Sequence, residues 1–289
     1  MRIGGILSVY KGDSPIFLKE ALESIIRNQT KIFDECVGVI EGEIDQQLKD
    51  VCKSFDEIKW FNISESTSFG LPKALNLAVE KINTEVVLKI DTDDLYSNKR
   101  IEWSYSAFKN DESLDLHGGQ IQEFSDDFKL HYGYRNVPLN QNDIENFFKY
   151  RNPFNGPSVA FRRDSFLKMG GFPQVGANED YCLWGLYIVN KMRISNSPEI
   201  YAFMRGGKAL VSRRNTNKYR LGELEALKFL KDSRALTNSQ YIRHIFVKQI
   251  IRRFPVKWNS YIYSKLRNNI EHKIPKELEV IIQTVQNEK

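Results

Sequence analysis

The sequence has few cysteines and no long apolar run, and both absences limit what the protein can be. Three cysteines, Cys36, Cys52 and Cys182, are spread over 289 residues. They form neither a disulfide framework nor the close spacing of a zinc site, so we expect them to be reduced. No stretch of about 18 apolar residues occurs, so we expect no membrane-spanning helix. The first 15 residues lack the apolar stretch and cleavage site of a signal peptide, so we expect a cytoplasmic protein.

Internal repeats and low-complexity segments are also absent, which argues against a repeat array. The composition is that of a globular protein, with 41% hydrophobic and 27% charged residues. The charges are unevenly distributed. Residues 1–204 carry 23 Lys and Arg against 30 Asp and Glu, whereas residues 205–289 carry 19 against 7. A basic tail after an acidic body indicates an anionic partner: membrane lipid, nucleic acid or a phosphorylated substrate.

The first 90 residues alternate short apolar runs with helical patterns. We expect strands at 3–10, 36–40, 58–63 and 85–90, and helices beginning at Pro15, Gln46 and Leu71. Strands separated by helices are typical of a parallel sheet covered on both faces. Ligands bind beyond the carboxyl ends of such strands. Lys11, Asp13 and Glu41 should therefore meet the charges that follow the fourth strand.

The rest of the chain has a less regular pattern. We expect strands at 116–124, 130–134 and 157–161, helices at 142–150 and 178–192, and a helical tail from about residue 219.

The most informative stretch is VLKIDTDDLY, residues 87–96, in which Asp91, Asp93 and Asp94 directly follow an apolar run. Carboxylates this close repel one another. Mg²⁺ or Mn²⁺ would relieve the repulsion and could bridge to a diphosphate. The alternative is a solvated acidic turn in which Asp94 caps the next helix, and the preceding buried-type strand makes this less favoured.

Two other enzyme classes place aspartates at strand ends. Haloacid-dehalogenase-type phosphatases use D-x-D-x-[TV], but Leu95 occupies the last position here and the motif lies in mid-chain. Sugar-nucleotide pyrophosphorylases carry a glycine-rich basic loop after the first strand, and SVYKGDSP does not supply one. Both classes are therefore disfavoured.

A second acidic pair, Glu179 and Asp180, opens an apolar helix after Asn178. Acidic residues are favoured at helix N-termini for electrostatic reasons alone. A carboxylate at this place could also serve as a general base that takes a proton from an acceptor hydroxyl. The residue types leave both interpretations open.

The order of several stretches is informative in combination. They are ILSVYKGDSPIFLKEALESIIRNQT, VGVIEGEID, GLPKALNLAV, LKIDTDDLYSNKRIE, HGGQIQEF, RNPFNGPSVAFRR, GGFPQVGANEDYCLW and PEIYAFMRGG, within residues 3–215. In this order the chain resembles the family-2 inverting glycosyltransferases of the GT-A fold, in particular the bacterial O-antigen, capsule and exopolysaccharide group of the amylovoran-biosynthesis type. The resemblance implies an α/β fold with a Rossmann-like, mostly parallel sheet at residues 1–215. A basic, aromatic, mainly helical extension would follow at residues 216–289.

The resemblance also implies roles for individual residues. Donor and nucleotide binding would involve Val9, Tyr10, Glu41, Leu71, Asn76, Lys89, Asp91, Thr92, Arg205, Arg213 and Arg214. The divalent cation, Mn²⁺ or Mg²⁺, would be held by Asp93 with Asp91. The catalytic base would be Asp180, supported by Glu179, and Asn155 and Gly156 would shape the acceptor side. Glu41 stands where the family usually has an Asp that hydrogen-bonds the uracil or ribose.

The three arginines would lie on a mobile loop over the diphosphate, where guanidinium groups pair bidentately with phosphate oxygens. A solvated surface loop is the alternative for them.

The implied reaction moves a hexose or N-acetylhexosamine from a nucleotide-diphosphate sugar, a UDP-sugar in particular, to a lipid-linked saccharide in O-antigen or capsule biosynthesis. Two alternatives remain open: a transferase acting on protein or a soluble glycan, and a catalytically silent GT-A module in an assembly complex. The presence of Asp91, Asp93 and Asp180 argues against a catalytically silent module.

Residues 241–267 interleave Ile, Phe, Trp and Tyr with Lys and Arg. A helix with this pattern can lie on anionic lipid, which suits a lipid-linked acceptor and a peripheral location on the inner face of the cytoplasmic membrane. Simple packing on the catalytic domain is the main alternative. Nucleic-acid binders also use such interleaving, but we expect no nucleic-acid partner.

Overall fold

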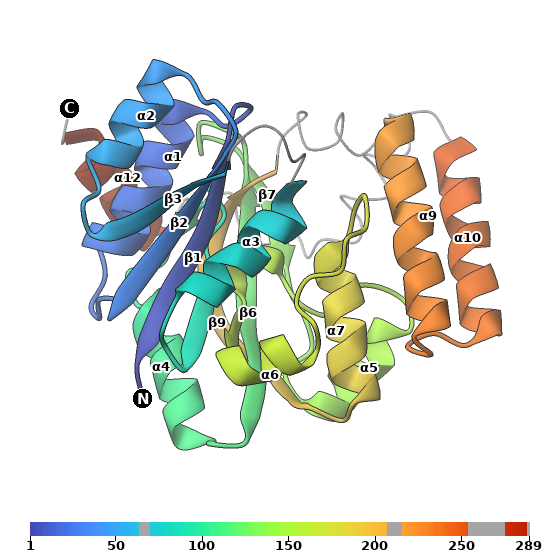
Figure 1. The fold of residues 1–289 in the computed structure, drawn as a ribbon. Helices are drawn as coiled ribbons and strands as arrows, with labels where there is room; N and C mark the ends of the chain where they lie inside the picture. The colour runs from blue at the N-terminus through green and yellow to red at the C-terminus, as the bar shows by residue number, and fades with distance from the viewer. Residues whose placement is uncertain (64–69, 207–215, 254–274, 288–289) are drawn as a thin grey trace.

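A computed structural model describes residues 1–63, 70–206, 216–253 and 275–287 (Figure 1). Within these ranges, nine strands form one sheet in the order β3-β2-β1-β4-β8-β6-β9-β5, and β7 pairs with β6 beside this path. Helices cover both faces of the sheet. The predicted α/β class, with a mainly parallel first half, is confirmed.

The first half is built from parallel strands joined by helices. Its elements are β1 (Ile3–Tyr10), α1 (Pro15–Leu22), the π-helical turn η1 (Glu23–Arg27), β2 (Glu35–Glu41), α2 (Gln46–Lys53), β3 (Ile58–Ile63), α3 (Gly70–Lys81) and β4 (Val86–Lys89). β1 pairs in parallel with β2 and β4, and β2 pairs in parallel with β3. As the sequence predicts, Ser14 caps α1 and Pro15 occupies its first turn.

The second half contains antiparallel pairs. Its elements are β5 (Leu95–Tyr96), α4 (Arg100–Asn110), β6 (Leu114–Phe124), β7 (His131–Arg135), α5 (Gln141–Phe148), the 3₁₀ turn η2 (Gly156–Ser158), β8 (Ala160–Arg162), α6 (Arg163–Lys168), α7 (Glu179–Val189) and β9 (Arg193–Arg205). β8 runs antiparallel to β4 and β6, whereas β9 runs parallel to β6. The predicted strand at 157–161 is wrong at its start, because Pro157 and Ser158 form η2.

Two hydrophobic cores lie on opposite faces of the sheet because strand side chains alternate. On β1, Leu7 and Val9 face the core shared with α1, α2 and α4. The neighbouring Ile6 faces the core shared with α3, α6 and α7. Helices thus cover both faces, and the ends of the strands position the site described below.

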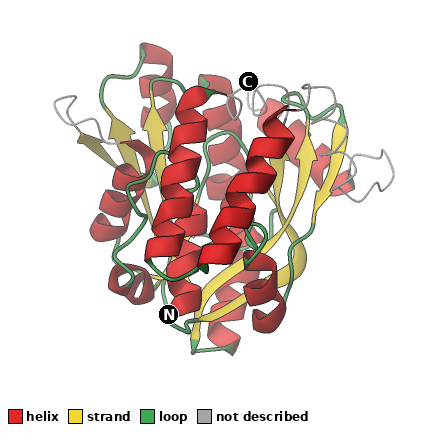
Figure 2. Cartoon of the chain, turned by 90° about the vertical axis from the view of Figure 1, so that its right-hand side faces the viewer, coloured by secondary structure: helices red, strands yellow, loops and turns green. Residues whose placement is uncertain are grey.

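Among the described residues, the C-terminal extension contains α9 (Asn217–Asp232), α10 (Asn238–Arg253) and α12 (Lys276–Asn287). α9 packs against α7, and α10 lies alongside α9 (Figure 2). A Cβ at Gly222 would lie 2.3 Å from the Gly176 carbonyl carbon, so α9 approaches this backbone closely enough to require glycine.

The last helix, α12, returns to the opposite side of the sheet, where Leu278 and Ile281 pack with Leu95 and Phe203. No helix among the described residues is both long and apolar enough to cross a membrane.

Candidate active site

Acidic side chains gather where β1, β2 and β4 end. The last residues of β1 and β2, Tyr10 and Glu41, are register partners. The Ser8 hydroxyl donates a 2.7 Å hydrogen bond to Glu41 Oε1, and the Tyr10 backbone N–H donates a 3.0 Å bond to Asp13 Oδ2. Asp13 and Glu41 are therefore both held at the ends of these neighbouring strands.

The electrostatics of Asp13 confirm that these strand ends converge. Burial, and then the nearby charges of Asp93 and Glu41, raise the pKa of Asp13 to about 6. Hydrogen bonds from the Tyr10 backbone and the Thr92 side chain act in the opposite direction. Carboxylates from three separate strand ends thus share one electrostatic environment, as the sequence predicts.

The turn after β4 is held by internal contacts. Lys89 is almost fully buried and forms an ion pair with Asp91. The Tyr96 hydroxyl accepts a 2.6 Å hydrogen bond from the Asp91 N–H and donates a 3.1 Å bond to the Asp91 carbonyl. The side chains of Asp91 and Asp93 are half-buried, so they remain partly accessible to a ligand after the end of β4.

Asp94 behaves differently from the two aspartates before it. It is buried and accepts a 2.9 Å hydrogen bond from the Arg205 backbone N–H. Burial, followed by the charges of Asp93 and Asp91, raises its pKa well above the ordinary value. Asp94 therefore fastens the acidic turn to the end of β9.

The structure corrects the prediction for Arg205, which is the last residue of β9 and not part of a loop. Its guanidinium is buried, donates to the Asp93 carbonyl at 2.6 Å and forms an ion pair with Glu20. It lies 4.1 Å from the ring of Phe17 and 4.4 Å from that of Phe128. A buried charge requires such partners, so Arg205 supports the acidic turn from behind. Arg213 and Arg214 lie outside the described residues.

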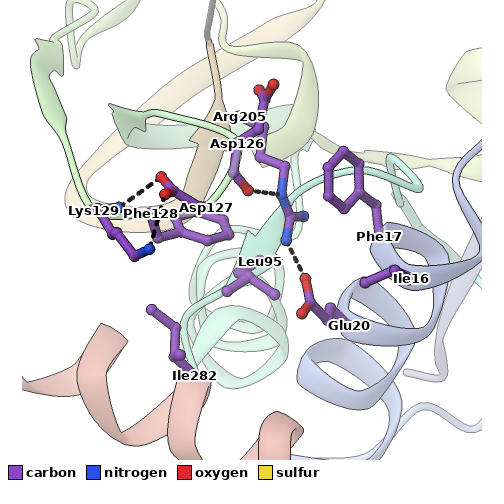
Figure 3. Close-up of a pocket in the computed structure, with 10 residues that line it drawn as sticks. All are labelled: Ile16, Phe17, Glu20, Leu95, Asp126, Asp127, Phe128, Lys129, Arg205 and Ile282. Carbon is purple, nitrogen blue, oxygen red and sulfur yellow. Dashed lines mark hydrogen bonds and ion pairs between the residues drawn. The ribbon is translucent and has the colours of Figure 1, made fainter.

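A pocket of about 350 Å³ lies beside this arginine (Figure 3). It is lined by Ile16, Phe17, Glu20, Leu95, Asp126, Asp127, Phe128, Lys129, Arg205 and Ile282. The Arg205 Nε donates to the Asp126 carbonyl at 2.9 Å, so the guanidinium is directed at protein groups around the pocket. The pocket therefore borders the support of the acidic turn.

The start of α7 brings the second acidic pair to the same end of the sheet. Asp180 Oδ1 accepts a 2.6 Å hydrogen bond from the Tyr181 N–H, and Oδ2 accepts a 2.9 Å bond from Asn152 Nδ2. A Cβ at Gly156 would lie 3.7 Å from Asp180 Oδ2. The absence of a side chain at Gly156 thus leaves space next to this oxygen.

Lys89 connects the two acidic groups. Although burial opposes its charge, Asp91, Glu179 and Asp180 raise the pKa of Lys89 above its ordinary value. Burial, and then the charge of Asp180, raise the pKa of Glu179 to about 7, with Lys89 acting against this shift. A carboxyl group that titrates near neutral pH in a cleft is a frequent feature of catalytic sites.

Other predicted donor-side residues differ in what their side chains can reach. Tyr10 and Leu71 are exposed, by 47% and 42%. Val9 is fully buried in a core, so its side chain does not line a pocket, and only its backbone could contact a nucleotide. The Asn76 amide is engaged with the backbone of Phe172, at 2.8 and 3.0 Å.

On the acceptor side, Asn155 is also fully buried, and its amide donates to the Gly119 carbonyl at 2.8 Å. It can shape this side only from behind, through the loop it holds. The contact between Asn152 and Asp180 is not predicted, although Asn152 lies in the stretch RNPFNGPS.

A divalent cation suits the donor set after β4. Asp91 and Asp93 offer the hard oxygen ligands that Mg²⁺ and Mn²⁺ prefer. Within the described ranges, no three His, Cys, Asp or Glu side chains are arranged to hold a metal together. Such cations commonly combine one or two carboxylates with water and substrate phosphates, so two aspartates are sufficient.

Comparisons with known proteins agree with this geometry. The sequence profile described as "Glycosyl transferase family 2" matches residues 6–170. The chain is 28% identical to "UDP-Gal:alpha-D-GlcNAc-diphosphoundecaprenol beta-1,3-galactosyltransferase" of Escherichia coli, over 90% of this chain and 94% of the relative. It is 29% identical to "Amylovoran biosynthesis glycosyltransferase AmsE" of Erwinia amylovora, over 91% and 98%.

Among solved structures, the fold is similar to that of S. aureus TarS, residues 1–349, in complex with UDP-GlcNAc. The TM-score is 0.61 at 19% identity, and the match covers 81% of this chain and 66% of that one, slightly under two-thirds of its length. At this identity the likeness concerns the fold alone, and it confirms the predicted GT-A architecture.

Proposed function

The chain belongs to glycosyl transferase family 2, and from this premise we propose an inverting hexosyltransferase. It would move a hexose or N-acetylhexosamine from a UDP-sugar to a lipid-linked saccharide in bacterial O-antigen or capsule biosynthesis. The observation that carries the proposal is the convergence of Asp13, Glu41 and Asp93 with Glu179 and Asp180 at one end of the sheet. The names of the relatives support the substrates, since one includes UDP-Gal and a diphosphoundecaprenol-linked sugar.

On the donor side, we assign nucleotide binding to the crevice between the ends of β1, β2 and β4. Glu41 is oriented by Ser8, and Tyr10 is exposed at the rim. Asp93 and Asp91 would hold a Mn²⁺ or Mg²⁺ ion, whose charge would offset that of the diphosphate leaving group. Lys89 keeps Asp91 in place and supplies a further positive charge beneath it.

On the acceptor side, we assign the role of general base to Asp180. Its Oδ2 borders the space left by Gly156, where an acceptor hydroxyl could come within hydrogen-bond distance. In an inverting displacement, the acceptor attacks one face of the sugar and the diphosphate leaves from the other. The base must therefore lie across the sugar from the diphosphate. Glu179, whose pKa is about 7, would modulate the charge next to this base.

We further propose that the extension at residues 216–289 brings the enzyme to the inner face of the membrane that carries its lipid-linked acceptor. Ile242 and Phe246 on α10 are each 64% exposed, on a helix that also carries basic residues. Truncation near residue 220 would remove Leu227 and Leu230, which are buried against α7. Ile242→Ser/Phe246→Ser is therefore the better variant, and it should co-sediment less with anionic liposomes than the wild type. Equal co-sedimentation would refute membrane docking through α10.

The transferase activity is tested by screening UDP-galactose, UDP-glucose and UDP-N-acetylglucosamine for a thermal shift in the presence of Mn²⁺. The sugar that stabilises the protein is then used to measure UDP release by slow transfer to water. Stabilisation by one UDP-sugar, together with UDP release that disappears on chelation, is the expected result. If no nucleotide sugar binds and no UDP is released, the proposed function is wrong.

A further inference from the structure

We propose that Asn152 is the residue that positions the base Asp180, an inference that rests on the proposed function. The Asn152 Nδ2 donates a 2.9 Å hydrogen bond to Asp180 Oδ2, from a loop 28 residues earlier in the chain. With the backbone bond from Tyr181 to Oδ1, this contact fixes both oxygens of the carboxylate. The side chain therefore has one defined orientation next to Gly156.

The Asn152 side chain is itself held by its own loop. Its Oδ1 accepts a 3.1 Å hydrogen bond from the Phe154 N–H, which directs Nδ2 toward the carboxylate. An amide has a donor side and an acceptor side, and here each of them has a partner. This arrangement determines which end of the amide meets Asp180.

The loop that carries Asn152 is fastened to the sheet by Arg135, the last residue of β7. Arg135 Nη2 donates to the Asn152 carbonyl at 3.0 Å, and Nη1 donates to the Phe154 carbonyl at 3.2 Å and to the side chain of Asn155. Asn155 in turn binds the Gly119 carbonyl in β6 at 2.8 Å. The base is thus oriented by a chain of contacts that begins in the rigid sheet.

The other end of this loop is held by the C-terminal extension. The Lys149 carbonyl accepts hydrogen bonds from Arg243 and, at 3.1 Å, from His244 Nε2, both on α10. The Arg243 guanidinium also lies 4.1 Å from the ring of Tyr150. The segment from Lys149 to Asn155 is therefore anchored on both sides of Asn152.

An ionised carboxylate offers about four acceptor positions. The bonds from Tyr181 and Asn152 use two of them, so Asp180 Oδ2 keeps a free lone pair for an acceptor hydroxyl. Without the amide, the carboxylate can rotate about its side-chain bonds. A misplacement of about 1 Å can lower a rate by about 100-fold.

The decisive variant is Asn152→Ala, which removes the donor to Asp180 without adding a charge. We expect kcat for UDP release from the UDP-sugar that the thermal-shift screen selects to fall by about 10- to 100-fold, while calorimetry shows unchanged UDP affinity. In an Asp180→Asn background, Asn152→Ala should cause no further loss, because the amide acts through this carboxylate.

Asn140→Ala is the matched control, since Asn140 Nδ2 donates to the Asp143 carboxylate at 2.7 Å on the exposed start of α5. It should lower the melting temperature and leave kcat unchanged. A rate for Asn152→Ala within twofold of the wild type would overturn the inference.

Crystal structures of the wild type and Asn152→Ala test the same point without a substrate. We expect the Asp180 side chain to change its rotamer in the variant, and an unchanged rotamer would also overturn the inference. If the wild type releases no UDP from any UDP-sugar, the proposed function fails, whereas the comparison of the Asp180 rotamers still decides the role of Asn152.

Discussion

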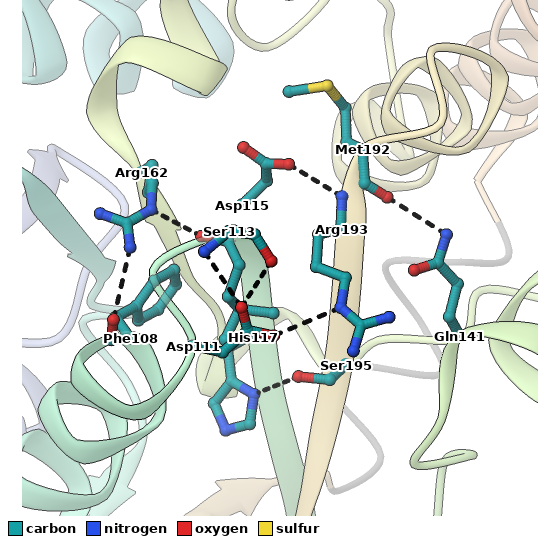
Figure 4. A network of polar contacts seen from close by, with 11 residues as sticks. Phe108, Asp111, Ser113, Asp115, His117, Gln141, Arg162, Met192, Arg193 and Ser195 are labelled. Carbon is teal, nitrogen blue, oxygen red and sulfur yellow. Dashed lines mark hydrogen bonds and ion pairs between the residues drawn. The ribbon is translucent and has the colours of Figure 1, made fainter.

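The two ends of the central sheet carry acidic residues in opposite situations. At the end where β6 and β9 begin, Asp115 accepts a 2.8 Å hydrogen bond from the Arg193 N–H (Figure 4). It also accepts a hydrogen bond from Ser165. Asp111 is bonded to Ser113 and to Arg193, at 3.3 Å for the latter, and these contacts lower its pKa. Asp111 and Asp115 are thus each matched by hydrogen-bond donors.

At the other end, burial and mutual repulsion dominate. The pKa values of Asp13 and Glu179 are raised to about 6 and about 7, and that of Asp94 is raised well above its ordinary value. Folding alone would not favour such crowding, because burial and like charges disfavour the ionised forms of Asp13, Asp94 and Glu179. The difference separates carboxylates with matched donors from the carboxylates for which we propose a role with a cation and a proton.

Asp180→Asn tests this contrast most severely. Loss of the proton acceptor should lower kcat by about 10²–10⁴-fold without changing UDP affinity. Asp115→Asn is the matched variant at the far end, and it should lower the melting temperature while leaving kcat unchanged. UDP release and calorimetric UDP binding are the two measurements. A near-wild-type rate for Asp180→Asn would remove this residue from its role.

Asp93→Ala tests whether the crowded charge serves a cation. The variant should abolish the Mn²⁺-dependent part of UDP binding, since the diphosphate then loses its bridging ion. Titration calorimetry with and without Mn²⁺ measures the effect, and Asp111→Ala serves as the control from the far end. Unchanged Mn²⁺-dependent binding in Asp93→Ala would contradict the metal assignment.

Glu179→Gln tests the energetic penalty at the crowded end. Because the folded-state pKa of about 7 lies above the ordinary 4.5, the folded protein keeps a proton between these values that the unfolded chain has lost. The contribution of Glu179 to stability therefore falls as the pH rises from 4.5 to 7. The variant should melt about 2–4 °C higher than the wild type at pH 8, and at the same temperature below pH 4.5.

Thermal unfolding monitored by circular dichroism across this pH range measures the difference. Glu112→Gln, the same change at an exposed site, should show no pH-dependent gain. A lower melting temperature for Glu179→Gln at pH 8 would mean that Glu179 stabilises the fold.

Asp111→Asn should have the smallest effect. Its contact with Arg193 is partly exposed, so the loss in unfolding free energy should stay below about 1 kcal/mol. Because its pKa is lowered, this contribution is present above the ordinary value of 3.8 and is lost as the pH falls further. Chemical denaturation of the wild type and the variant at pH 7 and pH 3 measures this contribution. A larger loss of unfolding free energy at pH 3 than at pH 7 would contradict the prediction.

Much of the fold follows from local pattern. The apolar runs at 3–10, 36–40, 58–63 and 85–90 become β1 to β4, and their order with the intervening helices predicts a parallel sheet. β9 is not predicted, because its first half is polar and contains Pro198, which argues against a strand. Its pairing with β6 overrides this local preference.

For the site, the sequence identified Asp91, Asp93, Glu179 and Asp180, since charge directly after an apolar strand or before an apolar helix is visible in the order of residues. The metal and base roles assigned to them stay predictions. The expected loop position of Arg205 is wrong. The sequence gives no sign of its buried ion pair, because its partner Glu20 lies 185 residues away. The sequence also gives no sign that Asn152 contacts Asp180, because the two residues lie 28 positions apart.

The sequence by itself therefore determined the strands and helices of the first half and which strand ends carry charge. Only the tertiary structure decided which side chains meet: Arg205 with Glu20, Asn152 with Asp180, and α12 with the sheet edge. Periodicity along the chain encodes the direction in which a side chain points, because each element has a fixed repeat. Contacts between distant segments depend on how the helices and the sheet pack together. The periodicity of a single segment carries no information about which distant segment it will contact.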